Sequence, residues 1–214
     1  MKHRTWISTA FVMYMLASCS FSPPVDTMPK ASPEFALQLD RATVPLLIRC
    51  GGKTYKASAV IVSRSHLLTA KHAVDCGAPV EEITGWIQAT DEMVNFQVDA
   101  MDSTADVARL RTVDLSYNLP DVAPSRGPIP ARWSIVCTAV ALPERRVYCG
   151  VVDASVEDWT VISTTGPSYP GNSGGGAYNK RGQLIGLVFG YYSKTPNAEH
   201  GEAIIELRIA GMMP

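Results

Sequence analysis

The sequence is poor in several residue types, and each shortage excludes a class of protein. Only 18% of the 214 residues are charged and the formal net charge is −1, so no strongly basic surface is available for nucleic acid. A zinc site built from His72 and Cys76 would lack its other ligands, because the chain has no C-x-x-C motif and no histidine pair. We therefore expect no nucleic-acid partner, no metal and no other cofactor.

Long apolar runs are absent except at the N-terminus, where Trp6–Leu16 follows a short basic start. This run is too short to span a bilayer stably and is typical of a secretory signal. It ends in Leu16-Ala17-Ser18-Cys19, which resembles the bacterial lipobox, in which the cysteine is acylated. The sequence thus predicts a signal peptide over residues 1–18 and a lipid anchor at Cys19. An ordinary signal peptide cut near Ser18 or Ser20 is the alternative.

The segment after the leader, residues 19–33, is rich in proline and has no apolar pattern, so we expect an extended tether. The protein would then be exported and held at the cell envelope by lipid. Ser20 follows the cysteine, which favours the outer membrane if the host is Gram-negative. Loss of Lys2 and Arg4 with the leader would bring the formal charge from −1 to about −3.

No long amphipathic helix is predicted before the C-terminus, and short apolar runs separated by Gly, Pro and Asn turns indicate an all-β barrel protein. We expect an N-terminal barrel over residues 34–118, a proline-rich crossing over 119–130 and a second barrel over 131–214. The predicted strands are Pro45–Cys50, Thr54–Ser63, His66–Thr69, Thr84–Ala89, Val94–Met101, Val107–Arg111, Arg132–Ala139, Arg146–Ala154, Trp159–Ser163, Gly175–Tyr178, Gln183–Phe189 and Glu202–Ile205.

One serine has backbone surroundings suited to acyl transfer, in the run Gly171-Asn172-Ser173-Gly174-Gly175-Gly176. Glycines allow positive φ and close approach of a substrate, so the N–H groups of Gly171 and Ser173 can point to one oxyanion. A flexible turn is the alternative reading of such a run. The buried strand predicted at Gln183–Phe189 argues against it, because a loop fixed by a hairpin is not a linker.

A serine nucleophile needs a base, and the best candidate among the four histidines is His72, which directly follows a predicted strand. His3 lies in the leader, His66 belongs to a strand with a packing pattern, and His200 lies in a polar loop. A histidine after a strand can also be purely structural. The chemistry therefore requires a third residue that orients the imidazole.

Asp106 is the best candidate for that residue, since it opens a strand-like run and can turn inward. Asp99 and Asp102 lie nearby in the sequence. Their alternating pattern indicates a strand with a solvated acidic face, so Asp106 is preferred.

These segments together resemble the trypsin-like serine protease family. Thr69-Ala70-Lys71-His72-Ala73 resembles T-A-A-H, Asp106-Val107-Ala108-Arg109-Leu110 resembles D-I-A-L-L, and Gly171-Asn172-Ser173-Gly174-Gly175 resembles G-D-S-G-G. The order His, Asp, Ser also agrees, and the match extends from about Thr43 to Leu207. The resemblance implies two six-stranded antiparallel barrels with the triad in the cleft between them, and a serine endopeptidase that acts through an acyl-enzyme.

Asn172 stands where animal digestive members of the family have aspartate, so activation by insertion of a new N-terminus is not expected. Asn172 and the run Gly201-Glu202-Ala203-Ile204, which is similar to G-F-A-I, resemble the bacterial high-temperature-requirement proteases. Those proteases usually carry a C-terminal peptide-binding domain. The sequence given ends at Pro214, so we expect no such domain here.

By the same resemblance, two segments wall the substrate pocket. Trypsin-like enzymes have an aspartate six residues before the serine, where this chain has Pro167. Cleavage after Arg or Lys is therefore not expected, and a small or medium apolar residue fits better. The expected pocket residues are Pro167, Ser168, Tyr169, Pro170, Phe189, Gly190 and Tyr191.

Four cysteines remain in the exported body, and an oxidising compartment favours disulfides. Cys137 and Cys149 lie at equal distances from Pro143 in an apparent hairpin, so they are expected to pair. Cys50 and Cys76 then pair by elimination and close a loop around His72.

Two other functions stay open from the sequence. The barrels could form an inactive, tethered binding module, or the same machinery could cleave esters.

Overall fold

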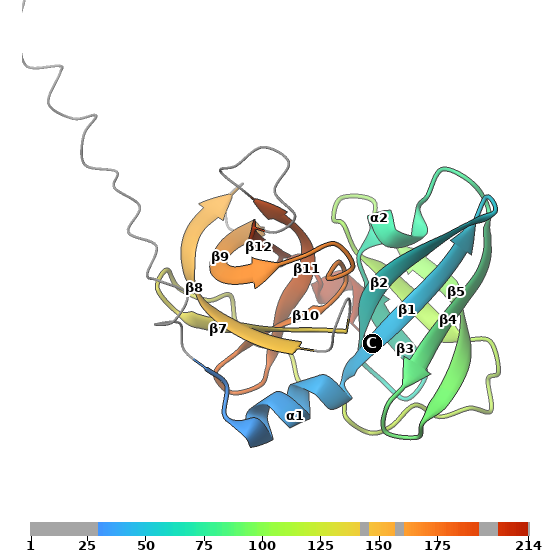
Figure 1. Ribbon diagram of the computed structural model, residues 1–214, viewed down its shortest axis with the longest axis horizontal. Coiled ribbons are helices and arrows are strands. Elements are labelled where there is room, and N and C mark those ends of the chain that lie inside the picture. Colours follow the sequence, from blue (N-terminus) through green and yellow to red (C-terminus); the bar gives the residue numbers. More distant parts are fainter. Residues whose placement is uncertain (1–29, 142–145, 157–160, 193–200, 214) are drawn as a thin grey trace, which may run out of the picture.

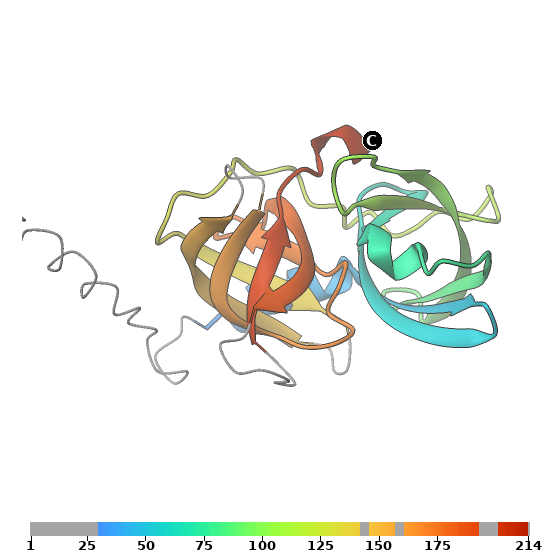
Figure 2. The ribbon, with the colours of Figure 1, turned by 90° about the horizontal axis from the view of Figure 1, so that it is seen from above.

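The computed structural model describes residues 30–141, 146–156, 161–192 and 201–213, and its strands form two closed barrels side by side (Figures 1 and 2). The first barrel closes in the order β1-β2-β3-β6-β5-β4 and the second in the order β10-β11-β12-β9-β8-β7. Neighbouring strands are antiparallel throughout both barrels. The all-β fold predicted from the sequence is confirmed.

The twelve strands agree in number and order with those expected from the sequence. Those of the first barrel are β1 (Thr43–Cys50), β2 (Lys53–Ile61), β3 (His66–Thr69), β4 (Val80–Ile87), β5 (Glu92–Met101) and β6 (Ala108–Thr112). Those of the second are β7 (Ile135–Val140), β8 (Arg146–Val156), β9 (Val161–Ser168), β10 (Gly176–Asn179), β11 (Leu184–Tyr192) and β12 (Gly201–Glu206).

Alternating burial explains why these segments form strands. In β1, Val44, Leu46 and Ile48 are buried in the barrel core while Leu47 and Arg49 are exposed. This period of two places one side of the strand against the barrel interior. Each barrel has such a core.

A helix that the sequence analysis missed precedes the first barrel. Helix α1 (Pro33–Arg41) begins after Ser32, whose Oγ accepts a hydrogen bond from the Phe35 N–H at 3.3 Å, and Pro33 occupies its first turn. Leu39 is the side chain of this helix that is buried. The helix contacts β7 and β8 of the second barrel as well as β1. The segment from residue 34, predicted to open the first barrel, thus begins with a helix that contacts both barrels, and the first strand of the barrel is β1.

An apolar cluster joins the two barrels. Val60, Leu68 and Val107 from the first half belong to the same buried cluster as Tyr178 and Leu187 from the second. The chain end reaches back to this cluster through Ile209 and Met212, and the 3-10 helix Ala210–Met212 lies beside the first barrel (Figure 2). A shared apolar core holds the barrels in a fixed relation, as a site built between them requires.

The crossing between the barrels has no regular strand, but it is paired locally. Arg126 forms an isolated parallel bridge with Leu184 of β11, and the Gly127 N–H donates to the Leu184 carbonyl at 2.7 Å. The predicted connection therefore runs beside the start of β11 in the second barrel.

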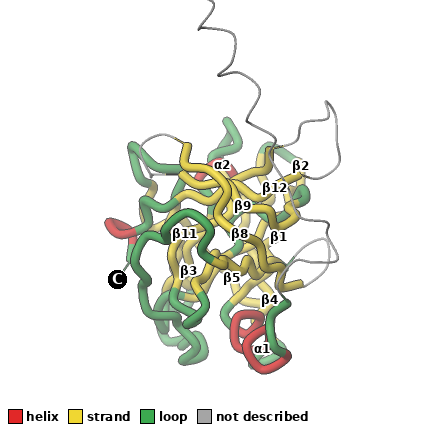
Figure 3. The backbone as a smooth tube through the Cα atoms, turned by 90° about the vertical axis from the view of Figure 1, so that its left-hand side faces the viewer, coloured by secondary structure: helices red, strands yellow, loops and turns green. Residues whose placement is uncertain are grey.

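Both predicted disulfides are confirmed. Cys137 and Cys149 are directly paired residues of β7 and β8. Cys50 and Cys76 connect the end of β1 to the segment after the short helix α2 (Lys71–Val74). Helices α1 and α2 lie at opposite ends of the molecule (Figure 3). Neither is long and apolar enough to cross a bilayer, and this holds for every helix in the part of the chain that the model describes.

Candidate active site

His72 lies on α2, immediately after strand β3. Residues 71–74 form one helical turn after the strand predicted at His66–Thr69. The Lys71 N–H donates to the Asp106 carbonyl at 3.3 Å, and the Lys71 Nζ donates to the Asp102 carbonyl at 3.0 Å. The turn that carries the imidazole is therefore attached to the loop that carries the aspartate.

Asp106 binds His72 through both carboxylate oxygens. Its Oδ2 lies 2.6 Å from the His72 Nδ1, and its Oδ1 accepts the His72 backbone N–H at 2.8 Å. Burial alone would raise the pKa of Asp106, but the two hydrogen bonds from His72, with the charges of His72 and Lys71, outweigh it and hold the pKa below its usual value. The carboxylate is thus ionised at neutral pH and fixes both the ring and its backbone.

Asp106 lies before its strand rather than in it, because β6 begins at Ala108. The loop is closed by a hydrogen bond from the Asp102 N–H to the Val107 carbonyl at 2.9 Å. The Asp102 Oδ1 accepts the N–H groups of Thr104 and Ala105 at 2.7 and 2.9 Å. Asp102 therefore shapes the loop that presents Asp106, which is a more specific role than the solvated face predicted for it.

The other ring nitrogen of His72 faces the serine. Its Nε2 lies 3.0 Å from the Ser173 Oγ, although the two residues are separated by 101 positions in the sequence. With the ionised Asp106 beside Nδ1, the proton of a neutral imidazole belongs on Nδ1, and Nε2 is free to accept the serine proton. The structure thus brings together all three residues selected from the sequence.

Two tight turns that share Asn172 shape the serine loop, and Ser173 is the second residue of the second turn. In the first, the Asn172 N–H donates to the Tyr169 carbonyl at 3.0 Å, with Pro170 second and Gly171 third at φ 94°. In the second, the Gly175 N–H donates to the Asn172 carbonyl at 2.9 Å, and Gly174 is third at φ 85°. Both match the type II turn, which needs positive φ at the third position and so favours glycine.

These turns leave two N–H groups unused. Among the described residues, no hydrogen-bond acceptor pairs with the N–H of Gly171 or of Ser173. Unpaired backbone donors beside a nucleophile are what an oxyanion hole requires. The pair of donors predicted from the glycine run is therefore available in the structure.

The serine loop presses closely on the first barrel at Gly174. A Cβ at this position would lie 2.0 Å from the Ser58 carbonyl oxygen and 2.3 Å from the Thr69 Oγ1. No side chain fits there, and the positive φ already favours glycine. This contact holds the loop of one barrel against the strands of the other.

Sequence reasoning missed Ser58, a fully buried residue of β2 that contacts this loop. Its N–H donates to the Ser173 carbonyl at 2.8 Å, and its Oγ donates to the Gly171 carbonyl at 3.0 Å. No local signal could have identified it, because a serine in a strand is unremarkable until its distant partners are known.

The remaining candidates lie apart from this cluster. His66 has its Nδ1 beside the Oγ of Ser63 and of Ser65, and its Nε2 lies 3.8 Å from Asp99. This is the packing role predicted for it. His3, His200 and Cys19 lie outside the described residues.

The residues expected to wall the substrate pocket come from two strands and the turn before the serine. Pro167 and Ser168 end β9, while Phe189, Gly190 and Tyr191 lie in β11. Ser168 is buried, and within the described chain its Oγ has no hydrogen-bond partner. The remaining two are Tyr169, whose ring lies 6.3 Å from that of Tyr148, and the exposed Pro170.

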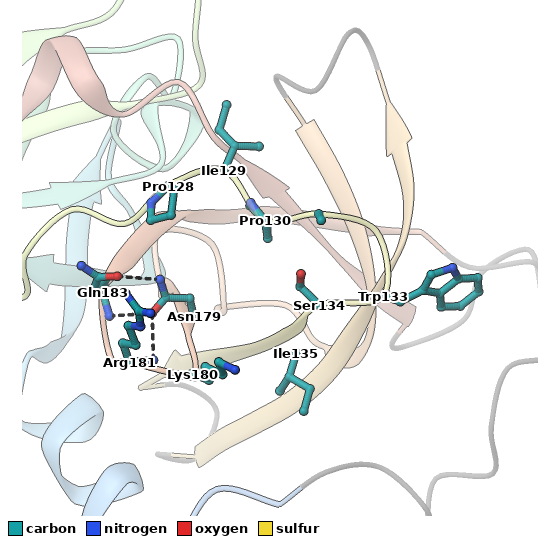
Figure 4. A pocket seen from close by; sticks show the side chains of 11 residues that line it. Pro128, Ile129, Pro130, Trp133, Ser134, Ile135, Asn179, Lys180, Arg181 and Gln183 are labelled. Atoms are coloured by element: carbon teal, nitrogen blue, oxygen red, sulfur yellow. Dashed lines mark hydrogen bonds between the residues drawn. The ribbon is translucent and has the colours of Figure 1, made fainter.

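Two cavities help to locate the accessible surface. One of about 340 Å³ lies beside the His–Asp pair and is lined by Lys71, His72, Asp106 and neighbouring residues. Another, of about 500 Å³, lies between the end of the crossing and the β10–β11 turn, with Ile129, Trp133 and Asn179 among its lining residues (Figure 4). It contains none of the three residues of the cluster, so its size does not mark the reactive centre.

Within the described residues, no three His, Cys, Asp or Glu side chains are grouped so that they could hold a metal ion.

The model of the trypsin-like peptidase domain matches residues 57–187, which include all three residues of the cluster. The chain belongs to the trypsin-like peptidase family. This agrees with the enzyme class predicted from the sequence, a serine endopeptidase. Comparison with curated proteins finds no match.

Solved structures of bacterial proteases share the fold. The HtrA-type protease AlgW with a tripeptide is 22% identical, with a TM-score of 0.69 over 86% of this chain and 61% of that one. Rv3671c from M. tuberculosis H37Rv, a serine-to-alanine mutant in an inactive form, is 18% identical, with a TM-score of 0.65 over 86% of this chain and 94% of that one. A serine endoprotease from Yersinia pestis is 20% identical, with a TM-score of 0.67 over 86% and 65%. The chain thus spans about 61% of the AlgW chain.

Proposed function

We propose that this protein is an exported serine endopeptidase in which Ser173, His72 and Asp106 act as the catalytic triad. The observation that carries the proposal is the continuous set of contacts from Asp106 Oδ2 through His72 to the Ser173 Oγ, at 2.6 and 3.0 Å. Each contact is within hydrogen-bond range, so a proton can pass from the hydroxyl to the ring without a large movement.

In the first step, the Ser173 Oγ attacks the carbonyl carbon of a peptide bond while the His72 Nε2 takes the hydroxyl proton. The new imidazolium is stabilised by the Asp106 carboxylate, which stays ionised because its pKa is lowered. The oxyanion formed on the substrate accepts hydrogen bonds from the free N–H groups of Gly171 and Ser173.

In the second step, the C–N bond breaks as His72 gives its proton to the leaving amine, and an ester to Ser173 remains. A water molecule then attacks this ester with His72 again as base, and the acid product leaves. All of these proton transfers use His72, so the proposed steps need no metal or cofactor.

The substrate is a protein or peptide. AlgW has been solved with a tripeptide, and its fold is shared here, which supports a peptide substrate for this chain. Pro167 provides no carboxylate for a basic side chain, so we expect cleavage after small or medium apolar residues. Profiling with a peptide library that gives strict cleavage after Arg or Lys would contradict this preference.

The location of the enzyme rests on the leader sequence. Export and a lipid anchor at Cys19 follow from the apolar run and the lipobox-like segment, with the barrels held off the membrane by the tether. A labelled fatty acid should enter the wild type and be absent from a Cys19→Ser variant. Equal labelling of the wild type and the variant would refute a lipid anchor at Cys19.

The catalytic proposal is tested with a fluorophosphonate probe and a casein assay. The wild type should react with the probe and cleave casein, while Ser173→Ala should do neither. Ser116→Ala, which alters an exposed serine beyond the first barrel, is the matched control and should behave as the wild type. Equal labelling of the wild type and Ser173→Ala would refute the assignment.

The same assays separate the alternatives. A folded wild type that is inert toward the probe, casein and a p-nitrophenyl ester would indicate a binding module. A wild type that cleaves only the ester would indicate an esterase.

A further inference from the structure

Ser58 lies where three segments of the molecule meet. It is fully buried in β2 of the first barrel, and its N–H and Oγ contact the serine loop of the second barrel. Its Oγ also accepts the N–H of Ala141, the residue just after β7, at 3.1 Å. Because an amide can only donate and a carbonyl can only accept, the hydroxyl proton must point to the Gly171 carbonyl.

The hydrogen bonds of the serine loop follow an alternating pattern along its peptide groups. The peptide between Gly171 and Asn172 is bonded at both ends, through its carbonyl to the Ser58 Oγ and through its N–H to the Tyr169 carbonyl. The peptide between Ser173 and Gly174 is also bonded at both ends, to the Ser58 N–H at 2.8 Å and to the Val188 carbonyl at 2.6 Å.

The peptide groups that carry the two free N–H donors alternate with these fixed ones. The Gly171 N–H belongs to the peptide before the first fixed group, and the Ser173 N–H belongs to the peptide between the two. Rotation of either donor would require the fixed peptides to move. Ser58 donates one hydrogen bond to each fixed peptide, and through these peptides it restrains the N–H groups of Gly171 and Ser173.

From this arrangement we infer that Ser58 is a positioning residue for the oxyanion hole and acts through its hydroxyl. It does not touch the substrate. It fixes the Gly171 carbonyl so that the neighbouring N–H donors stay aimed at the point where the oxyanion forms. Donors that are already oriented need no reorganisation during the reaction, and this is the source of their effect on rate.

Ser58→Ala would remove the hydroxyl and leave the Gly171 carbonyl and the Ala141 N–H without this partner in a buried site. The Ser58 N–H, which is a backbone group, would remain bonded to Ser173. We expect kcat to fall about tenfold with little change in KM, since one hydrogen bond is lost and the donors themselves are retained. Affinity for a peptide boronate, which forms the tetrahedral adduct, should fall by a similar factor.

Thr43→Val is the matched control. Thr43 is also buried, and its Oγ1 donates to a carbonyl, that of Leu39 at 2.9 Å, but it lies outside the serine loop. Both variants lose a buried hydroxyl, so a general loss of stability should appear in both. The fall in kcat should appear only in Ser58→Ala.

The inference rests on the proposed function, so a second measurement does not depend on activity. Amide hydrogen exchange at Asn172 and Gly174 should be faster in Ser58→Ala than in the wild type and in Thr43→Val. An inert wild type would overturn the proposed function. The hydrogen-exchange measurement would still test whether Ser58 restrains the serine loop. Wild-type kcat in folded Ser58→Ala, or unchanged exchange at both amides, would overturn the positioning role.

Discussion

Two histidines six residues apart each lie beside a serine and an aspartate, but their surroundings differ. His72 has Asp106 at 2.6 Å on one nitrogen and Ser173 at 3.0 Å on the other. His66 has Ser65 at 2.9 Å on Nδ1, while the Asp99 Oδ2 lies 3.8 Å from Nε2. The same three residue types therefore occur twice within the first barrel and its contacts.

The cations around the aspartate account for much of the difference. Asp99 is bound by the Arg109 Nε at 2.7 Å and approached by the Arg111 Nε at 3.9 Å, so its charge is already compensated. Burial, followed by the charge of Arg109, lowers the pKa of His66 despite the opposite effect of Asp99. Asp106 instead directs its two oxygens to the ring and the backbone of His72. We therefore expect a Ser, His, Asp set to be reactive only when the carboxylate is hydrogen-bonded to the histidine and not paired with other cations.

The surroundings of the serine also differ. Ser173 lies in a loop with two positive-φ glycines and two unpaired N–H donors. Ser65 lies in the turn before β3, where its Oγ faces the same ring nitrogen as that of Ser63. The Ser65 N–H already donates to the Ser63 Oγ at 3.3 Å, so it is not free to stabilise an oxyanion as the Ser173 N–H is.

The largest expected effect is on activity, when each of the two histidines is replaced by alanine in turn. His72→Ala should lower kcat/KM by about 10⁴-fold or more, because both proton transfers are lost. His66→Ala should keep activity within about twofold of the wild type, after correction for the folded fraction. Casein cleavage by the purified variants measures both. A similar loss in the two variants would abolish the distinction drawn between the sites.

A smaller effect should appear in stability as a function of pH. A carboxylate with a lowered pKa stabilises the fold above the pKa of the unfolded chain, about 3.9, and this contribution is lost as the pH falls through the folded pKa. The difference in free energy of unfolding between the wild type and Asp106→Asn should therefore shrink between pH 5 and pH 2.5. Denaturant titrations at several pH values measure it, and a constant difference over that range would contradict the lowered pKa.

The smallest effect concerns His66 alone. Arg109→Gln should raise the pKa of His66, because it removes the cation with the larger effect against protonation of the ring. Arg111→Gln should raise it less, since Arg111 contributes less to the shift. NMR titration of the His66 imidazole measures the pKa in both variants. A larger rise in Arg111→Gln than in Arg109→Gln would contradict the stronger effect assigned to Arg109.

Much of the fold could be predicted because its signals are local. Alternating apolar residues such as Val44, Leu46 and Ile48 mark strands without knowledge of their partners. Helix α1 also has local signals, the Ser32 cap and Pro33, but a nine-residue helix is only marginally stable alone and depends on burial of Leu39. The helix at His72 is shorter still, so its single turn carries no periodic pattern.

The sequence by itself indicated Ser173, His72 and Asp106, because a glycine-rich run, a histidine after a strand and an aspartate before a later strand are short, readable patterns. Only the tertiary structure decided how they are held. Ser58 reaches the Gly171 carbonyl across 113 positions and the Ala141 N–H across 83. Such contacts have no local signature, since their free energy appears only when the two barrels are packed together.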